Sequence, residues 1–101
     1  VAVAVCGKRR LVNFKHFEYS ACGVPWISDW AEDLEALGFV GGRHFVSYFC
    51  PEEAIVSIKA MIEMECGFGD ELASSARSLV LSRHTAQHRS QDLLDIVAQK
   101  L

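Results

Sequence analysis

The sequence lacks a long apolar run and a secretion signal. Its longest uninterrupted apolar run covers residues 1–6, far short of the roughly 20 residues that a transmembrane helix needs. The basic residues Lys8, Arg9 and Arg10 follow this run instead of preceding it, which is the reverse of their order in a signal peptide. We therefore expect no membrane span and a cytoplasmic protein.

The sequence also lacks an excess of positive charge. It has 10 Lys and Arg residues against 13 Asp and Glu residues, a formal net charge of -3. This balance gives no electrostatic reason to expect a nucleic-acid or anionic-membrane partner. The arginines at positions 77, 83 and 89 leave a helical nucleic-acid binder as a weaker alternative.

No two cysteines form a close C-x-x-C pair in the set Cys6, Cys22, Cys50 and Cys66. A chain that can build an ordinary core needs no disulfide framework, so we expect free thiols and no zinc site. His84 and His88 have the spacing of helical metal ligands. If Thr85 is the N-cap of the last helix, His84 lies outside that helix, and we interpret both histidines as helix-boundary residues.

Hydrophobic residues make up 50% of the 101 positions and charged residues 23%, which is typical of a globular chain rather than a disordered one. This length suffices for one small domain with one core, and we treat residues 1–101 as a single domain. Because Val1 already lies inside a strand-like run, we expect the sequence to be part of a longer protein.

Apolar strands alternate with helical patterns along the chain. Strand-like runs cover residues 1–5, 24–28 and 44–49, and helical patterns begin near Phe14, Ala31, Pro51 and Asp70 and after Thr85. This alternation predicts an α/β fold with a parallel sheet. Three strands are few for such a sheet. We therefore predict the carboxyl-terminal half of a Rossmann-like domain, with a partial three-stranded parallel sheet followed by a helical C-terminal segment.

The first helix carries Phe14, Phe17 and Ala21 at helical spacing. Asn13 is a suitable N-cap for it, and Gly23 supplies the left-handed residue that commonly ends helices. Asp29 follows the second strand, and we interpret it as the cap of the next helix.

The amino end of the Phe14 helix is the best candidate for a binding site, because free N–H groups and the helix dipole attract anions there. The preceding loop holds Lys8, Arg9 and Arg10, which form either a solvated turn or a cationic rim around a phosphate. Glu18 lies one turn into the helix. It is either an ordinary surface glutamate or an acid that accepts hydrogen bonds from sugar hydroxyls, as in dinucleotide-binding folds.

Residues 15–25 read K-H-F-E-Y-S-A-C-G-V-P. They resemble the F-E-A-x-A-C-G-V-P signature in the donor-binding domain of two-domain (GT-B type) glycosyltransferases that use nucleotide sugars. Further segments are similar to that family's motifs: Asp29-Trp30 with Leu34 and Leu37, Gly42-Arg43 through Pro51-Glu52-Glu53, and Arg83-His84-Thr85 with His88-Arg89. The resemblance covers nearly the whole chain and is closest to the spore-maturation (CgeB-like) branch of the group 1 glycosyl transferases.

The resemblance implies an enzyme segment that binds the diphosphate and ribose of a nucleotide-sugar donor for transfer of the sugar to an acceptor, which the sequence leaves undefined. It implies that Glu18 binds the ribose, that Asn13, Phe14 and Lys15 lie at the phosphates, and that Arg10 lies near them. No metal or cofactor is implied. The family's base-binding half-domain and N-terminal domain are not in this sequence, so we expect no turnover from it alone.

Three positions depart from the family pattern. Arg10 stands where many members have a second glutamate, Cys50 replaces the usual Asp and Ala76 the usual Gly. Arg10 leaves open whether the sugar's configuration would be retained or inverted. It also favours an alternative in which the chain is a truncated or degenerate copy that acts as a non-catalytic interaction module.

Overall fold

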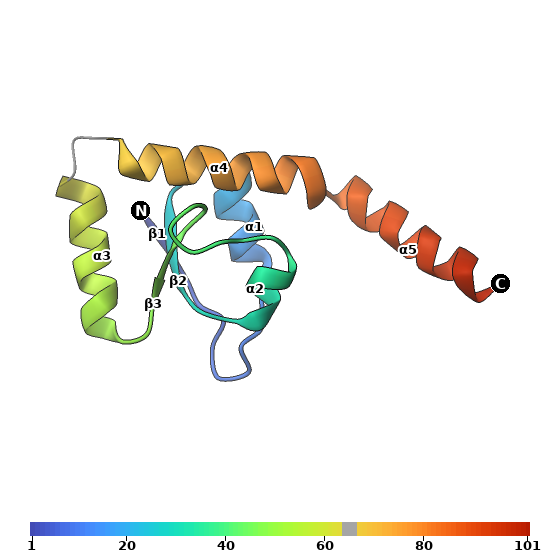
Figure 1. Ribbon diagram of the computed structural model, residues 1–101, viewed down its shortest axis with the longest axis horizontal. Coiled ribbons are helices and arrows are strands. Elements are labelled where there is room, and N and C mark those ends of the chain that lie inside the picture. The colour runs from blue at the N-terminus through green and yellow to red at the C-terminus, as the bar shows by residue number, and fades with distance from the viewer. Residues whose placement is uncertain (64–66) are drawn as a thin grey trace.

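The computed structural model describes residues 1–63 and 67–101. It contains one sheet of three parallel strands, in the order β1-β2-β3, made of β1 (Ala2–Ala4), β2 (Trp26–Asp29) and β3 (Val46–Tyr48). In the register of this sheet, Val3 pairs with Ile27 and Ile27 with Val46. The predicted partial Rossmann-like α/β fold is therefore confirmed (Figure 1).

The described residues contain five helices. The two helices that connect the strands are α1 (Phe14–Ala21) and α2 (Glu32–Ala36), and those that follow β3 are α3 (Pro51–Glu63), α4 (Phe68–Arg83) and α5 (Ala86–Lys100). The strands are shorter than predicted, and α4 begins at Phe68 instead of Asp70 because its N-cap is Gly67 in a left-handed conformation. The predicted free thiol of Cys66 lies outside the described residues, whereas Cys6, Cys22 and Cys50 are free.

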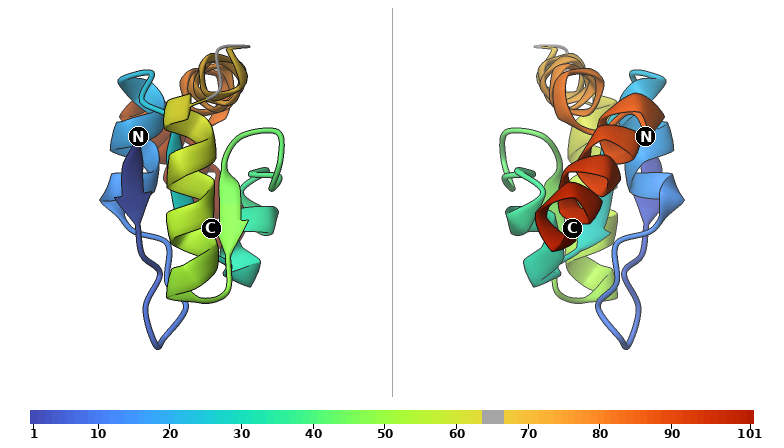
Figure 2. Two further views of the ribbon diagram at one scale, coloured as in Figure 1. Left: turned by 90° about the vertical axis from the view of Figure 1, so that its left-hand side faces the viewer. Right: turned by 90° about the vertical axis from the view of Figure 1, so that its right-hand side faces the viewer.

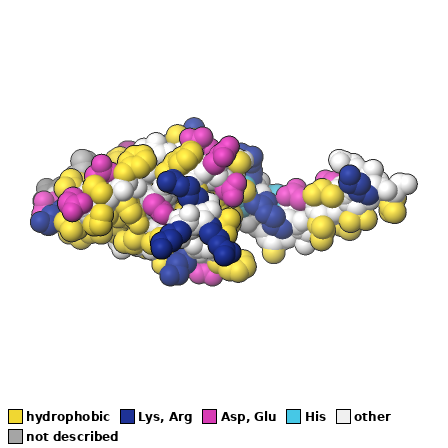
Figure 3. Space-filling view, turned by 90° about the horizontal axis from the view of Figure 1, so that it is seen from below, with side chains coloured by type: hydrophobic (Ala, Val, Ile, Leu, Met, Phe, Trp, Pro, Cys, Tyr) yellow, Lys and Arg dark blue, Asp and Glu magenta, His cyan; other side chains and the backbone are white. Residues whose placement is uncertain are grey.

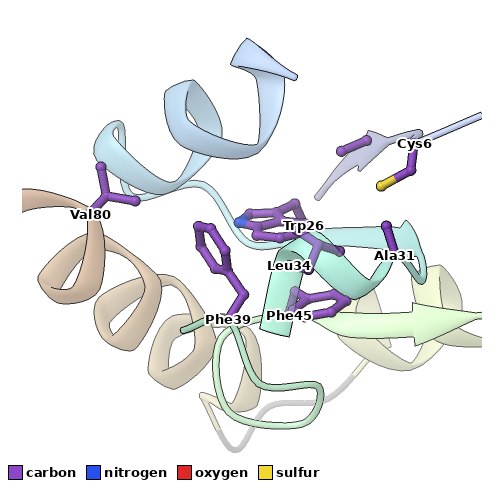
Figure 4. Close-up of a cluster of buried hydrophobic side chains, with 8 residues drawn as sticks. Cys6, Trp26, Ala31, Leu34, Phe39, Phe45 and Val80 are labelled. Atoms are coloured by element: carbon purple, nitrogen blue, oxygen red, sulfur yellow. The ribbon is translucent and has the colours of Figure 1, made fainter. Parts of the chain in front are cut away.

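One face of the sheet carries an aromatic cluster. Trp26, Phe39 and Phe45 are almost completely buried, and Trp26 stacks on Phe45 with ring centroids 4.7 Å apart and meets Phe39 edge to face at 5.5 Å. Figure 4 shows these rings between the sheet, α2 and Val80 of α4. The indole Nε1 donates to the Ser20 hydroxyl of α1 at 2.9 Å, so the buried polar atom of Trp26 has a partner.

The opposite face of the sheet packs on α3 and on the start of α4. Ile27 follows Trp26 in β2 and points to this other face, as alternation along a strand requires. It forms a second cluster with Met61 of α3 and Leu72 of α4. Helices therefore cover both faces of β2, the central strand.

Helix α1 buries a different face from the one predicted. Phe17 packs partly against the aromatic cluster, but Phe14 is 81% exposed. The fully buried residues of α1 are His16 and Ser20. The apolar spacing predicted the helix correctly. The side of α1 that faces the interior is nevertheless polar and is hydrogen-bonded to β2.

Helix α4 crosses the amino ends of the strands (Figures 1 and 2). Two of its side chains fix it there, because they contact backbone carbonyl groups at the carboxyl ends of α1 and α2. Arg77 Nε donates to Ala21 O of α1 at 3.2 Å, and His84 Nε2 lies 2.6 Å from Leu37 O, at the end of α2. The carboxyl ends of the strands, at the lower edge in Figure 1, remain free of this helix.

Helix α5 extends away from the body of the molecule, which measures 54 × 28 × 16 Å in total (Figure 1). It has no buried residue. Its start confirms the predicted N-cap, because Thr85 Oγ1 accepts from His88 N and Thr85 N donates to His88 Nδ1. The interpretation of His84 and His88 as helix-boundary residues is also confirmed, since His84 is the C-cap of α4. In the described residues, no helix has the length and apolarity to cross a membrane.

Candidate functional site

The carboxyl ends of β1 and β2 meet the amino end of α1, the place predicted to bind an anion. Asn13 is the N-cap of α1, as predicted. Its Oδ1 accepts from Lys15 N at 2.9 Å, and its Nδ2 donates to Val5 O at 2.8 Å. A single side chain thus ties the start of α1 to the chain that leaves β1.

Most N–H groups at this helix end already have partners. Asn13 N donates to His16 Nδ1 at 3.2 Å, completing a capping box, and His16 N donates to Asn13 O at 3.3 Å. Phe14 N has no hydrogen-bond partner among the described residues. An anion at this end would therefore meet one free backbone donor, the helix dipole and the nearby cationic side chains.

Asp29 holds the loop between β1 and α1. Its Oδ1 accepts from Cys6 N at 2.6 Å and its Oδ2 from Gly7 N at 3.1 Å. The prediction that Asp29 caps the next helix is wrong, because the N-cap of α2 is Ala31, without a side-chain cap. The physical reason is that β1 stops pairing at Ala4, which leaves two backbone donors for the carboxylate.

A buried polar chain lies behind this loop. His16 Nδ1 accepts from Asn13 N, which leaves the proton of a neutral ring on Nε2. Nε2 lies 3.1 Å from Ser28 Oγ, and Ser28 Oγ donates to Asp29 O at 2.8 Å. Each donor in this series therefore meets an acceptor. Sequence reasoning missed His16, although the capping spacing Asn13-x-x-His16 was a usable signal.

Burial sets the charge of this cluster. It lowers the pKa of His16, which is completely buried, and favours the neutral ring. Burial also raises the pKa of the Cys6 thiol, whose Sγ lies 3.5 Å from His16 Nε2. The raised pKa keeps Cys6 a thiol, and His16 Nε2, which faces it, already carries the ring proton and cannot accept another. We therefore interpret this cluster as a support for the loop rather than as a catalytic pair.

The five predicted donor-binding residues gather around the start of α1. Asn13, Phe14, Lys15 and Glu18 lie on or next to the first turn of α1, and all are exposed. Arg10 approaches from the loop, where its Nη1 donates to Trp30 O at 3.3 Å. Seen from below in Figure 3, Lys and Arg side chains gather on this end of the body.

Arg10 has an unusual backbone. Its φ of 52° is the one positive value among the described non-glycine residues. Left-handed backbone in a long, non-glycine residue is disfavoured. Strain of this kind often occurs at binding sites, and here it lies at the rim of the predicted one.

The predicted site is an open surface. The surface cavities described for residues 1–63 and 67–101 include none lined by Arg10, Asn13, Phe14, Lys15 or Glu18. A ligand bound here would be covered on one side only. Within the same residues, no group of three or more His, Cys, Asp or Glu side chains is placed to hold a metal ion.

Replacing Asp29 with Asn tests the loop support. The amide retains one acceptor oxygen but offers a donor to the second N–H group. We expect D29N to lower the free energy of unfolding by about 1–3 kcal/mol and to speed hydrogen exchange at the Cys6 and Gly7 amides. Denaturant unfolding and exchange NMR measure both effects. The exposed Asp33 provides the control D33N, for which we expect a change within about 0.5 kcal/mol; equal effects in the two variants would contradict the assignment.

The buried His16 predicts a pH dependence of stability. In the unfolded chain a histidine has a pKa of about 6.5, whereas the folded pKa of His16 is lower. The unfolded state therefore binds more protons as the pH falls below about 6.5, and the free energy of unfolding decreases until the folded pKa is passed. His44 and His84 add to this slope, because burial lowers their pKa values too.

The variant H16Q isolates the contribution of His16. Glutamine at the third helical position can still cap Asn13 N, but it does not titrate. We expect H16Q to lose less stability than the native chain between pH 7 and pH 5, as measured by urea unfolding at each pH. The same slope in both proteins would show that His16 is not its source.

Comparison with known protein families gives a match over most of the chain. A family model described as "Glycosyl transferase-like" matches residues 5–95. This range includes the end of β1, the loop supported by Asp29 and all five predicted donor-binding residues. No curated protein and no solved structure gave a significant match.

Proposed function

Because the chain belongs to the glycosyl transferase-like family, we propose that it is the donor-binding part of a glycosyltransferase. In this proposal, the carboxyl edge of the sheet binds the diphosphate and the ribose of a nucleotide-sugar donor. The observation that carries the proposal is the amino end of α1, which is fixed by Asn13 and Asp29 and yet opens to solvent among exposed cationic and acidic side chains.

The diphosphate is bound by charge more than by backbone amides. The capping box uses the N–H groups of Asn13 and Lys15, which leaves Phe14 N. The ammonium group of Lys15 and the guanidinium of Arg10 supply the positive charge. Lys15 acts as a point charge, so it gives less directional binding than a bidentate arginine would.

Glu18 binds the ribose. It follows Lys15 by three residues in α1 and therefore lies on the same side of the helix, one turn further in. A carboxylate accepts hydrogen bonds from two neighbouring hydroxyl groups. Dinucleotide-binding folds use the same arrangement, in which the helix start binds the phosphates and an acidic side chain binds the ribose hydroxyls.

This segment contributes electrostatic stabilisation to sugar transfer. The bond from the sugar to the donor phosphate breaks as negative charge grows on the departing nucleoside diphosphate. Cations and a helix dipole that are fixed beforehand stabilise that charge without having to reorganise. The open site requires a second wall, which we assign to the N-terminal domain of a two-domain protein that also binds the acceptor.

The free edge of β1 supports the proposal that the sheet continues. Among the described strands, in the order β1-β2-β3, β1 has a neighbour on one side only. Its Val3 side chain is 42% exposed, and the neighbouring Val1 and Val5 are about half exposed. Further strands of a Rossmann-like domain would pair with this edge, and the helices that connect them would cover these side chains.

Titration with nucleotides tests the donor site in the chain itself. We expect UDP, GDP or ADP, and the matching nucleotide sugars, to shift the amide NMR signals of residues 7–18, with weak, millimolar affinity because the open site covers a ligand on one side only. Glu18→Ala should weaken binding roughly tenfold or more, as expected for lost hydrogen bonds to a charged group. Glu35→Ala, exposed on α2, is the matched control and should bind as the native chain does. Unchanged affinity in E18A would remove Glu18 from the site.

The exposed valines also favour a second candidate, a non-catalytic interaction module that self-associates through β1. This candidate predicts a concentration-dependent dimer in sedimentation velocity. Val3→Lys should abolish the dimer, because a charged side chain on an edge strand opposes pairing. Val56→Lys, at a 67% exposed position on α3, should leave it intact. A native chain that stays monomeric at all concentrations would exclude this candidate.

A further inference from the structure

Two residues form the whole connection between the two C-terminal helices. His84 is the C-cap of α4, and Thr85 is the N-cap of α5. Helix α5 has no buried residue, and it extends away from the body of the molecule (Figure 1). Its direction therefore depends on the side-chain contacts that are made at this junction.

His84 joins α2 to α5 through its two ring nitrogens. Nε2 lies 2.6 Å from Leu37 O, at the end of α2, and Nδ1 lies 2.6 Å from Arg89 Nη2 of α5. A carbonyl oxygen can only accept a hydrogen bond, and a guanidinium can only donate one. Nε2 therefore carries the ring proton and Nδ1 is the acceptor, so both contacts require a neutral ring.

Arg89 links α5 to the rest of the molecule. Besides its bond to His84, its Nη1 donates to Arg83 O at 3.3 Å, and its Cζ lies 6.0 Å from the centre of the Phe17 ring in α1. In the part of the chain that the structure describes, no other side chain of α5 is hydrogen-bonded to α4 or to its C-cap. Because the guanidinium is rigid and planar, a displacement from His84 Nδ1 also weakens the bond to Arg83 O.

Aromatic rings fix the position of the His84 ring from the other elements that pack on it. Phe39 stacks on this ring, with centroids 6.0 Å apart, and Phe17 of α1 is tilted against it at 5.6 Å. The ring has little room to turn away from its two hydrogen-bond partners. A change in its charge must therefore be accommodated by the partners.

The charged groups around His84 are mostly cationic. Burial lowers the pKa of His84, and the charges of Arg89, Arg83 and His88 lower it further, whereas the hydrogen bond to the carbonyl of α2 acts in the opposite direction. Asp92 forms an ion pair with Arg89 at 3.3 Å, within α5. Among the described residues, no carboxylate contacts the His84 ring.

We propose that His84 is a pH-dependent hinge residue, which fixes the direction of α5 while its ring is neutral and releases α5 when the ring is protonated. A proton on Nδ1 would face Arg89 Nη2, so two donors and two positive charges would meet where one hydrogen bond now forms. Arg89 leaves with α5, where Asp92 remains its partner. The bond to Leu37 O survives, because Nε2 donates in both forms of the ring.

Release changes the orientation of an apolar side of α5 relative to the body. The residues on this side are at least 47% exposed: Leu93, Leu94, Val97 and Leu101. The hinge lies at the carboxyl end of α4, and it operates whether or not the start of α1 binds a nucleotide sugar.

Residual dipolar couplings, measured by NMR on the whole chain, test the hinge. We expect the couplings of the α5 amides to fit the alignment tensor of α4 and the strands at pH 7, and to lose this fit as the pH falls, with a midpoint below about 6.5. The ¹⁵N chemical shifts of the His84 ring report its protonation, and the two transitions should coincide. If the α5 couplings still fit once the ring is protonated, the proposal is overturned.

Two alanine variants test the arginine contact without a change of pH. Arg89→Ala removes a side chain that is 43% exposed and should make α5 lose the common fit already at pH 7. Lys100→Ala removes another cation of α5 and should leave the fit unchanged. An R89A variant whose α5 fits as well as that of the native chain would contradict the hinge.

The variant H88Q separates the two histidines of the junction. His88 Nδ1 accepts from Thr85 N, so its protonation would also disturb the start of α5. Glutamine retains the capping box and takes up no proton. We expect H88Q to keep the pH-dependent release of α5. Loss of the transition in this variant would assign it to His88 and refute the role of His84.

Discussion

The Asp29 carboxylate is the constraint on which the carboxyl edge of the sheet depends. After β1 stops pairing at Ala4, the N–H groups of Cys6 and Gly7 would be left without partners, and Asp29 accepts from both. Asn13 completes the arrangement by joining Val5 O to the first turn of α1. These side chains define where the loop runs and the direction in which α1 starts, and every ligand contact proposed at this edge depends on that geometry.

The two edges of the sheet are built differently. At the amino edge, α4 contacts the ends of α1 and α2 through Arg77 and His84, so that edge is covered by protein. At the carboxyl edge, side chains hold the loop from within and leave its outer surface exposed. Ligands of parallel α/β sheets bind beyond the carboxyl ends of the strands. In this molecule α4 covers the opposite edge, so the region beyond the carboxyl ends stays accessible.

Local features were predictable from the sequence, and long-range polar contacts were not. The caps at Asn13 and Thr85 and the left-handed Gly23 depend on a few adjacent residues, and the structure has all three. Asp29 was misassigned because its partners lie 22 and 23 residues away. His16 was overlooked because its buried position depends on Ser28, which lies in strand β2. Binary patterning could not show that α1 turns a polar side inward.

The left-handed backbone of Arg10 bears on which residue type this turn favours. Glycine adopts such a backbone without steric cost, whereas a side chain at φ 52° costs roughly 1 kcal/mol. A turn selected for stability alone would therefore favour glycine at position 10. The long cation at this position means that the backbone carries a standing energetic penalty, and the hydrogen bond from its guanidinium to Trp30 O is a contact that offsets part of it.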